Sequence, residues 1–105
     1  MAADVCIVMT TVTDAGQAKA IARAVVEARL AACAQILPMS SCYRWDGKIV
    51  EDSEQMMLFK TLAGQYAALE AFLLERHPYD TPEIVRLPVD GVGGKYRDWL
   101  ISEVG

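Results

Sequence analysis

The 105-residue sequence lacks most of the features by which a function is usually recognised. It has one histidine, and its three cysteines form no Cys-x-x-Cys pair. An odd number of scattered cysteines argues against a disulfide framework and a zinc knuckle, and it predicts a reducing compartment. No apolar run approaches the roughly 20 residues that cross a bilayer, and no segment has the pattern of a signal peptide. We therefore expect a cytoplasmic protein with no membrane partner.

Clustered positive charge is also missing. The net charge is −4, and the ten basic residues are scattered along the chain. Because binding to phosphates requires clustered lysine and arginine, we expect no nucleic acid partner. The Gly-Val-Gly-Gly segment at 91–94 lacks the Lys-Ser/Thr that follows in a phosphate-binding loop.

The sequence contains no obvious pairing of a nucleophile with a base. A Cys33–His77 dyad would require the two residues to meet in the fold and the pKa of the thiol to be lowered. The alanines around Cys33 favour a small buried residue instead. We therefore predict that the protein is not an enzyme.

Apolar residues, in contrast, are abundant. They make up 53% of the chain, which is more than one small core needs. The length predicts a single domain over residues 1–105. The surplus apolar surface predicts that copies of the chain associate.

Alternating patterns and turn signals predict the first half of the fold. Residues 5–11 are apolar at both alternating positions, which indicates a strand buried on both faces. Asp14 is the expected N-cap of a helix that extends to Ala32. Asp46 and Gly47 predict a type I′ turn between two strands. The returning strand, like the first, has apolar residues on both faces.

The second half of the sequence completes a recognisable order. A helix with Leu69 and Leu73 on its apolar side ends before Pro78. Residues 83–89 are predicted to form a strand in which Pro88 indicates a sheet edge or the end of the strand. Trp99 and Leu100 mark a short closing helix. The order is that of a ferredoxin-like α+β fold, βαββαβ, with an antiparallel sheet and a short C-terminal helix. Its helices cover one face of the sheet, so we expect another copy to cover the other.

His77 is the first candidate site residue. It begins the stretch His-Pro-Tyr-Asp-Thr-Pro-Glu-Ile at the end of the second helix. An imidazolium there would suit the negative end of the helix, and a metal-binding role remains an alternative. A metal site needs further ligands, and only Asp80 and Glu83 lie at short spacing. Met9 and the other methionines either fill a core or form a soft copper site.

Charged residues on the strand at 48–62 supply further candidates. Lys60 lies among apolar residues, where an ammonium group needs an anionic partner in a salt bridge or a ligand. Glu51, Asp52 and Glu54 follow the predicted turn and either attract cations or keep the hairpin soluble.

Four blocks together resemble the CutA family of divalent-cation tolerance proteins. They are Leu-Ala-Ala-Cys-Ala (30–34), Tyr-Arg-Trp-Asp-Gly-Lys-Ile (43–49), the segment from Glu54 to Thr61, and the His-Pro-Tyr block (77–84). The resemblance covers essentially the whole chain. It implies a ferredoxin-like fold, a homotrimer whose three sheets face a common interior, and a role in tolerance of copper and other divalent cations.

The resemblance also implies a metal site. In family members with a described copper site, the ligands are a cysteine near the end of the first strand and two consecutive histidines before Pro-Tyr. The matching positions here are Met9, Arg76 and His77. We therefore expect copper or another divalent cation to bind weakly at His77, with Met9 as a soft substitute ligand.

An alternative function comes from a second resemblance, to the trimeric PII signalling proteins, which bind small effectors in clefts between subunits. It predicts a regulatory or scaffolding trimer that binds an anion in a cleft containing Lys60, Glu54, Tyr79 and Trp45. The PII docking loop falls where this chain has only the turn at 46–47. That difference favours the divalent-cation hypothesis.

Overall fold

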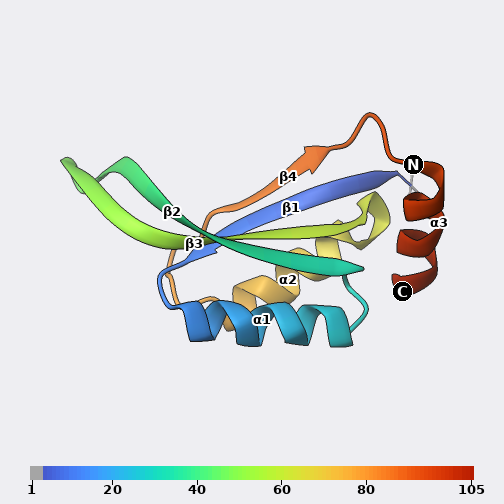
Figure 1. Cartoon of the computed structure of the whole chain (residues 1–105). Coiled ribbons are helices and arrows are strands. Elements are labelled where there is room, and N and C mark those ends of the chain that lie inside the picture. Colours follow the sequence, from blue (N-terminus) through green and yellow to red (C-terminus); the bar gives the residue numbers. More distant parts are fainter. Residues whose placement is uncertain (1–3) are drawn as a thin grey trace.

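The computed structural model describes residues 4–105 as one four-stranded sheet with helices (Figure 1). The elements in chain order are β1 (Val5–Val12), α1 (Ala15–Glu27), β2 (Cys33–Trp45), β3 (Lys48–Leu62), a 3-10 turn (Ala63–Gln65), α2 (Tyr66–Arg76), β4 (Ile84–Pro88) and α3 (Gly94–Glu103). The strands are antiparallel in the order β2-β3-β1-β4. The predicted fold class is confirmed, with β1 and β3 central and β4 at an edge.

The hydrophobic core lies between the sheet and helices α1 and α2, which both cover the same face (Figure 1). Val8 of β1 pairs with Phe59 of β3, and both side chains are fully buried. Leu69 and Leu73 of α2 close the core from the helix side. Each such side chain stabilises the fold by about 1.5–3 kcal/mol relative to exposure.

Two local sequence signals are confirmed. The Asp14 carboxylate accepts the backbone N–H of Gln17 at 2.8 Å and caps α1. At the hairpin tip, Asp46 and Gly47 have φ values of 52° and 74°, as a type I′ turn requires.

Helix α1 ends earlier than the sequence predicts, at Glu27 instead of Ala32. Arg29 takes a left-handed conformation with φ 59°. The N–H of Leu30 then bonds to the carbonyl of Val25 at 3.1 Å, which is a Schellman ending. Glycine usually holds the left-handed position, so an arginine there gave no sequence signal for the end of the helix.

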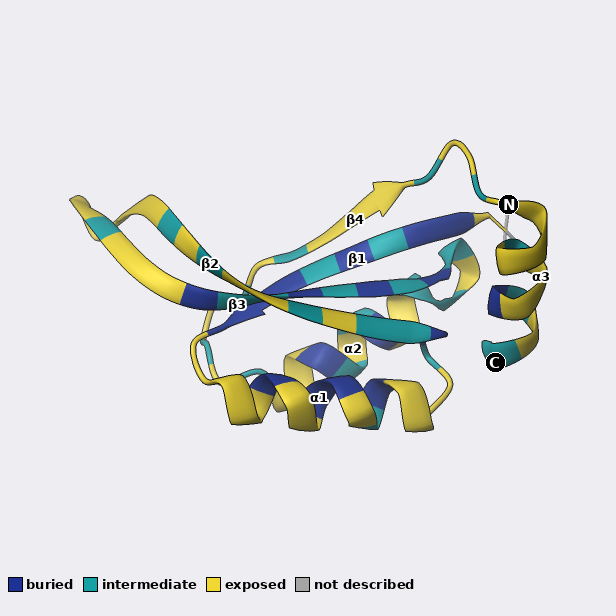
Figure 2. Ribbon diagram, viewed as in Figure 1, coloured by how far each residue is buried: buried dark blue, intermediate teal, exposed yellow. Residues whose placement is uncertain are grey.

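Within residues 4–105 the opposite face of the sheet is covered by a helix only at one end, where Tyr96 and Leu100 of α3 pack near Lys60 and Val5. Met9 pairs with Leu58 on β3 and with Val85 on β4, and these three side chains lie on that face. Leu37 and Leu87 on the outer strands are 44% and 42% exposed. Figure 2 shows the outer strand β4 largely exposed while the central strands are more buried. We call this the open sheet face.

The hairpin formed by β2 and β3 projects well beyond the rest of the sheet (Figure 1). Pairing of β1 with β3 ends at Val12 and Gln55, so the hairpin beyond that point pairs only with itself. It carries exposed apolar side chains, with Trp45 at 58% and Ile49 at 60%.

Helix α3 packs at the other end of the sheet, away from the hairpin tip (Figure 1). Its Leu100 is buried with Val5 and Ala32. The Arg29 side chain donates to the carbonyl of Ser102 at 3.0 Å and so holds the end of α3 against the end of α1. None of the helices in residues 4–105 is long and apolar enough to cross a membrane.

Candidate functional site

His77 caps the end of α2 and uses both ring nitrogens in hydrogen bonds. Its Nδ1 accepts the backbone N–H of Tyr79 at 3.1 Å. Its Nε2 lies 2.9 Å from the carbonyl oxygen of Thr11, which can only accept, so Nε2 carries the proton. Burial lowers the pKa of His77 below its ordinary value. The ring is therefore neutral, and the expectation of a capping imidazolium is wrong.

The structure does not bring His77 and Met9 together within one subunit. His77 reaches the hydroxyl of Thr10 at 3.1 Å, and Thr10 faces the helices. Met9, the preceding residue, therefore lies on the open sheet face. Arg76 lies along α2, with its guanidinium 3.6 Å from the centre of the Phe72 ring. In the described part of the chain, no three His, Cys, Asp or Glu side chains are grouped as a metal site.

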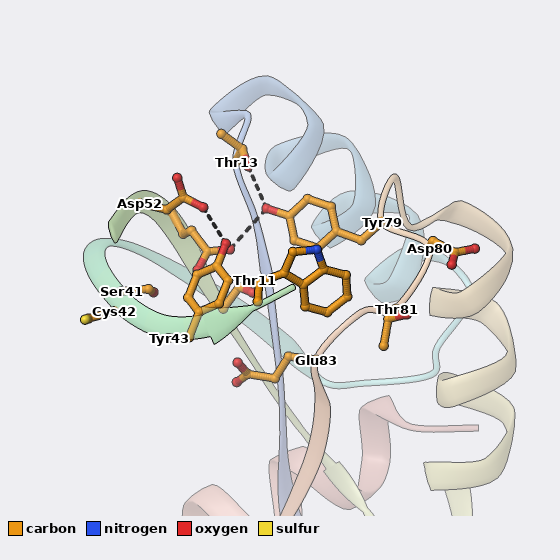
Figure 3. Close-up of a pocket in the computed structure, with 12 residues that line it drawn as sticks. Thr11, Thr13, Ser41, Cys42, Tyr43, Asp52, Tyr79, Asp80, Thr81 and Glu83 are labelled. Atoms are coloured by element: carbon orange, nitrogen blue, oxygen red, sulfur yellow. Dashed lines mark hydrogen bonds between the residues drawn. The ribbon is translucent and has the colours of Figure 1, made fainter. Parts of the chain in front are cut away.

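A cavity of about 640 Å³ lies where the hairpin leaves the sheet. The end of β1, the hairpin and the segment after α2 form its walls (Figure 3). Its lining is acidic and aromatic, with no lysine, arginine or histidine from residues 4–105. We call it the acidic pocket; its acids are Asp52, Glu54, Asp80 and Glu83, and its aromatic residues are Tyr43, Trp45 and Tyr79.

Two tyrosine hydroxyls organise the acids of this pocket (Figure 3). The hydroxyl of Tyr79 donates to Glu54 Oε2 at 3.1 Å, so the Thr13 hydroxyl, 2.6 Å away, donates to Tyr79. The Tyr43 hydroxyl donates to Asp52 Oδ2 at 2.5 Å. That bond raises the pKa of Tyr43 to about 12, and burial raises the pKa of Tyr79. Both phenols stay protonated at neutral pH and remain donors.

Glu54 presents a free acceptor to the pocket. Glu54 is only 7% exposed, and its Oε2 accepts the hydrogen bond from the Tyr79 hydroxyl. Every fully buried side-chain nitrogen or oxygen in the described residues has a hydrogen-bond partner. Oε1 has no partner among those residues, so it is not fully buried. Oε1 is therefore open to the cavity. An accessible, unpaired oxygen on a largely buried carboxylate favours a cationic or hydrogen-bond-donating ligand.

Three of the four residues predicted to form a ligand cleft meet in this pocket: Glu54, Tyr79 and Trp45. Lys60 does not join them. It lies toward the other end of β3, where its Nζ is 5.7 Å from the centre of the Tyr96 ring. Within residues 4–105 it has no carboxylate partner, so the predicted salt bridge is not formed in the subunit.

The cysteines take no part in this pocket's hydrogen bonds. Cys33 Sγ lies 3.5 Å from the Tyr96 hydroxyl, at the α3 end of the sheet, so it forms no dyad with His77. The three thiols in residues 4–105 are free, as the sequence predicts. Cys6 is buried, whereas Cys42 is exposed on the hairpin.

Two features of the pocket were not predicted from the sequence: Tyr43, and the shared position of Asp80 and Glu83 on the wall. A signal for Tyr43 existed. The turn at 46–47 pairs Ser41 with Asp52, which makes Tyr43 and Asp52 diagonal neighbours on one face. No comparable signal places Asp80 and Glu83, because their segment is not part of a strand or helix that fixes its direction.

Comparisons with known proteins show close relatives. A family model described as CutA1 divalent ion tolerance protein matches residues 6–103. The divalent-cation tolerance protein CutA of Thermus thermophilus is 43% identical over 100 residues, which cover 94% of this chain and 97% of that protein.

Solved structures agree with this family match. The structure of CutA from Synechococcus elongatus PCC7942 matches with a TM-score of 0.94 and 45% identity, covering 98% of this chain and 92% of that one. A second structure of that protein, complexed with Bis-Tris, matches with a TM-score of 0.90 and 44% identity, covering 96% and 94%.

Proposed function

The chain belongs to the CutA1 divalent ion tolerance protein family, and on this premise we propose that it binds cations weakly in the acidic pocket of a homotrimer. The observation that carries the proposal is the lining itself, with four carboxylates and no basic side chain from residues 4–105. A cavity walled by one sign of charge concentrates ions of the opposite sign. The proposed role is binding, without a catalytic step.

The ions proposed are copper or another divalent cation. Weak binding is expected because the described chain offers no preformed group of three metal-ligating side chains. Carboxylates favour magnesium, calcium or manganese over copper. A copper site at His77 with Met9 stays a prediction, and it would require His77 to give up a hydrogen bond to Tyr79 or Thr11.

Bis-Tris is an amine that carries hydroxyl groups, and a relative from Synechococcus elongatus has been solved in complex with it. This supports a cationic ligand for the present fold as well. The proposed cytoplasmic location rests on the sequence alone, through its odd number of scattered cysteines. Among the relatives, one solved structure is described as periplasmic.

The proposal of a homotrimer is supported by the open sheet face. Met9, Leu58 and Val85 form a continuous apolar strip across three strands. A soluble protein rarely leaves such a face uncovered. Three sheets that face a common interior would bury it.

One observation favours the PII-like alternative. Lys60 is half-buried on the open sheet face and has no carboxylate partner within residues 4–105. An anion between subunits would neutralise it. The acidic pocket itself disfavours an anion, so this alternative requires a different cleft, centred on Lys60.

Equilibrium dialysis with Mn²⁺, Zn²⁺ and Cu²⁺ tests the main proposal. We expect saturable weak binding that Glu54→Gln reduces at least several-fold. Asp90→Asn, which removes the same charge outside the pocket, serves as the matched control. If none of the three ions binds saturably, the proposal is contradicted.

For the PII-like alternative, nucleotides and small anions should shift the unfolding temperature of the wild type. This shift should disappear in Lys60→Ala.

A further inference from the structure

We propose that the acidic pocket is a site for a small hydroxylated ammonium compound, an organic cation and not only a bare metal ion. The inference rests on the proposed function in one respect, namely that cations bind in this pocket. It goes further by naming the chemical class that the pocket fits.

The size of the pocket is the first argument. A volume of about 640 Å³ falls within the range of about 300–1,000 Å³ that is typical of small-molecule sites. A bare divalent ion is much smaller and needs several ligands at about 2.0–2.6 Å. No group of three metal-ligating side chains exists in residues 4–105. The carboxylates are therefore spread over the walls, as a larger cation requires.

Several carboxylate acceptors in the pocket are free. Glu54 Oε1 is open to the cavity, as described above. Asp80 and Glu83 make no hydrogen bond or ion pair with any described residue, and both line the cavity. An ammonium group has several N–H donors that point in different directions. It can satisfy acceptors on separate walls at one time.

The aromatic walls are the third argument. Tyr43, Tyr79 and Trp45 line the same cavity as the acids. Ring faces attract organic cations, and tryptophan does so best. Trp45 is 58% exposed, so its ring is accessible to a ligand. Its place on the lining of an acidic cavity fits a cation stacked on the indole.

Hydroxyl groups complete the match. Thr13, Ser41 and Thr81 also line the pocket. Each hydroxyl both donates and accepts hydrogen bonds, so these residues suit the hydroxyl groups of a ligand. A hydroxylated ammonium compound therefore matches the acids, the rings and the hydroxyls together.

The test uses protonated Tris (tris(hydroxymethyl)aminomethane) and pentaerythritol, an uncharged polyol of nearly the same shape. Each is titrated calorimetrically into the full-length protein in cacodylate buffer, which contains no amine. We expect saturable binding of Tris and at least tenfold weaker binding of pentaerythritol.

Variants then assign the binding to the pocket. Glu54→Gln should weaken Tris binding at least tenfold, with Asp90→Asn as the charge-matched control. Trp45→Ala should weaken Tris binding several-fold and leave Mn²⁺ binding unchanged, whereas Trp45→Phe should recover part of the loss. Ile49→Ala, at an exposed position on the same hairpin, should have no effect. Thermal unfolding curves confirm that each variant is folded.

The outcomes separate the inference from the proposed function. Equal affinity for Tris and pentaerythritol, or no saturable Tris binding, would overturn the inference. If Mn²⁺ then still binds and Glu54→Gln abolishes that binding, the proposed function stands alone. Loss of both ligands would overturn both.

Discussion

The Nδ1 atom of His77 accepts the backbone N–H of Tyr79 at 3.1 Å. This bond turns the chain after α2 so that the Tyr79 hydroxyl reaches Glu54. The histidine therefore lies behind the acidic pocket and positions one of its walls. A residue that sequence comparison would single out as a metal ligand acts here through a hydrogen bond to its neighbour.

Replacing His77 tests this positioning role. His77→Ala removes an acceptor from Tyr79 and a donor from Thr11. It should lower the free energy of unfolding by about 1–3 kcal/mol, because part-buried partners lose their bonds. His77→Asn should recover part of the loss, since an asparagine oxygen can accept the N–H two residues later. Urea unfolding at one fixed protein concentration measures both. Equal stability of the alanine variant and the wild type would contradict the role.

The same residue predicts a pH dependence of stability. Burial holds the pKa of folded His77 below 6.5. As pH falls below that value, the unfolded chain takes up a proton that the folded chain resists. The contribution to stability is therefore complete above about pH 6.5 and decreases toward the lower folded pKa. Unfolding midpoints measured across this window should fall more steeply in the wild type than in His77→Asn. Parallel curves would rule out His77 as the source.

A phenol with a raised pKa should be detectable in the ultraviolet. The bond from Tyr43 to Asp52 raises the pKa of Tyr43 to about 12. In Asp52→Asn, the charged acceptor is gone and the pKa should return toward the ordinary value of about 10. Absorbance titration of tyrosinate should then show one of the four tyrosines ionising at lower pH. Asp90→Asn should leave the titration unchanged.

The oligomeric state can be tested with two leucines of similar exposure. Leu37 lies on the open sheet face and is 44% exposed, and Leu74 on α2 is 53% exposed. If the open sheet faces meet in a trimer, Leu37→Asp buries a charge and should dissociate it. Leu74→Asp should leave the trimer intact. Light scattering at micromolar concentration distinguishes a trimer from a monomer. A monomeric wild type would refute the assembly.

The sequence was sufficient to predict the fold because its signals are local and repeated. Apolar residues at both alternating positions of β1 and β3 required central strands, and Asp46-Gly47 set the register of the hairpin. The early end of α1 could not be predicted, because Arg29 occupies a conformation that glycine usually takes.

The candidate site was predicted only in part, because it combines distant segments. The resemblance to PII proteins placed Glu54 and Lys60 in one cleft, and the two residues do share one face of β3. Strand residues advance by about 3.3 Å each, however, so positions 54 and 60 lie about 20 Å apart. The segment from Tyr79 to Glu83 is held at the pocket by hydrogen bonds of Tyr79 to the side chains of His77, Thr13 and Glu54, which no periodic pattern encodes.

The position of α3 has a practical consequence. The C-terminus follows α3 and lies at the opposite end of the molecule from the projecting hairpin (Figure 1). The Arg29 side chain and the bond from the N–H of Gly105 to the Arg29 carbonyl, at 2.9 Å, anchor that end. A tether attached after Gly105 would thus leave the acidic pocket facing solution. The protein can be immobilised through its C-terminus on a sensor chip for screening amines and metal ions.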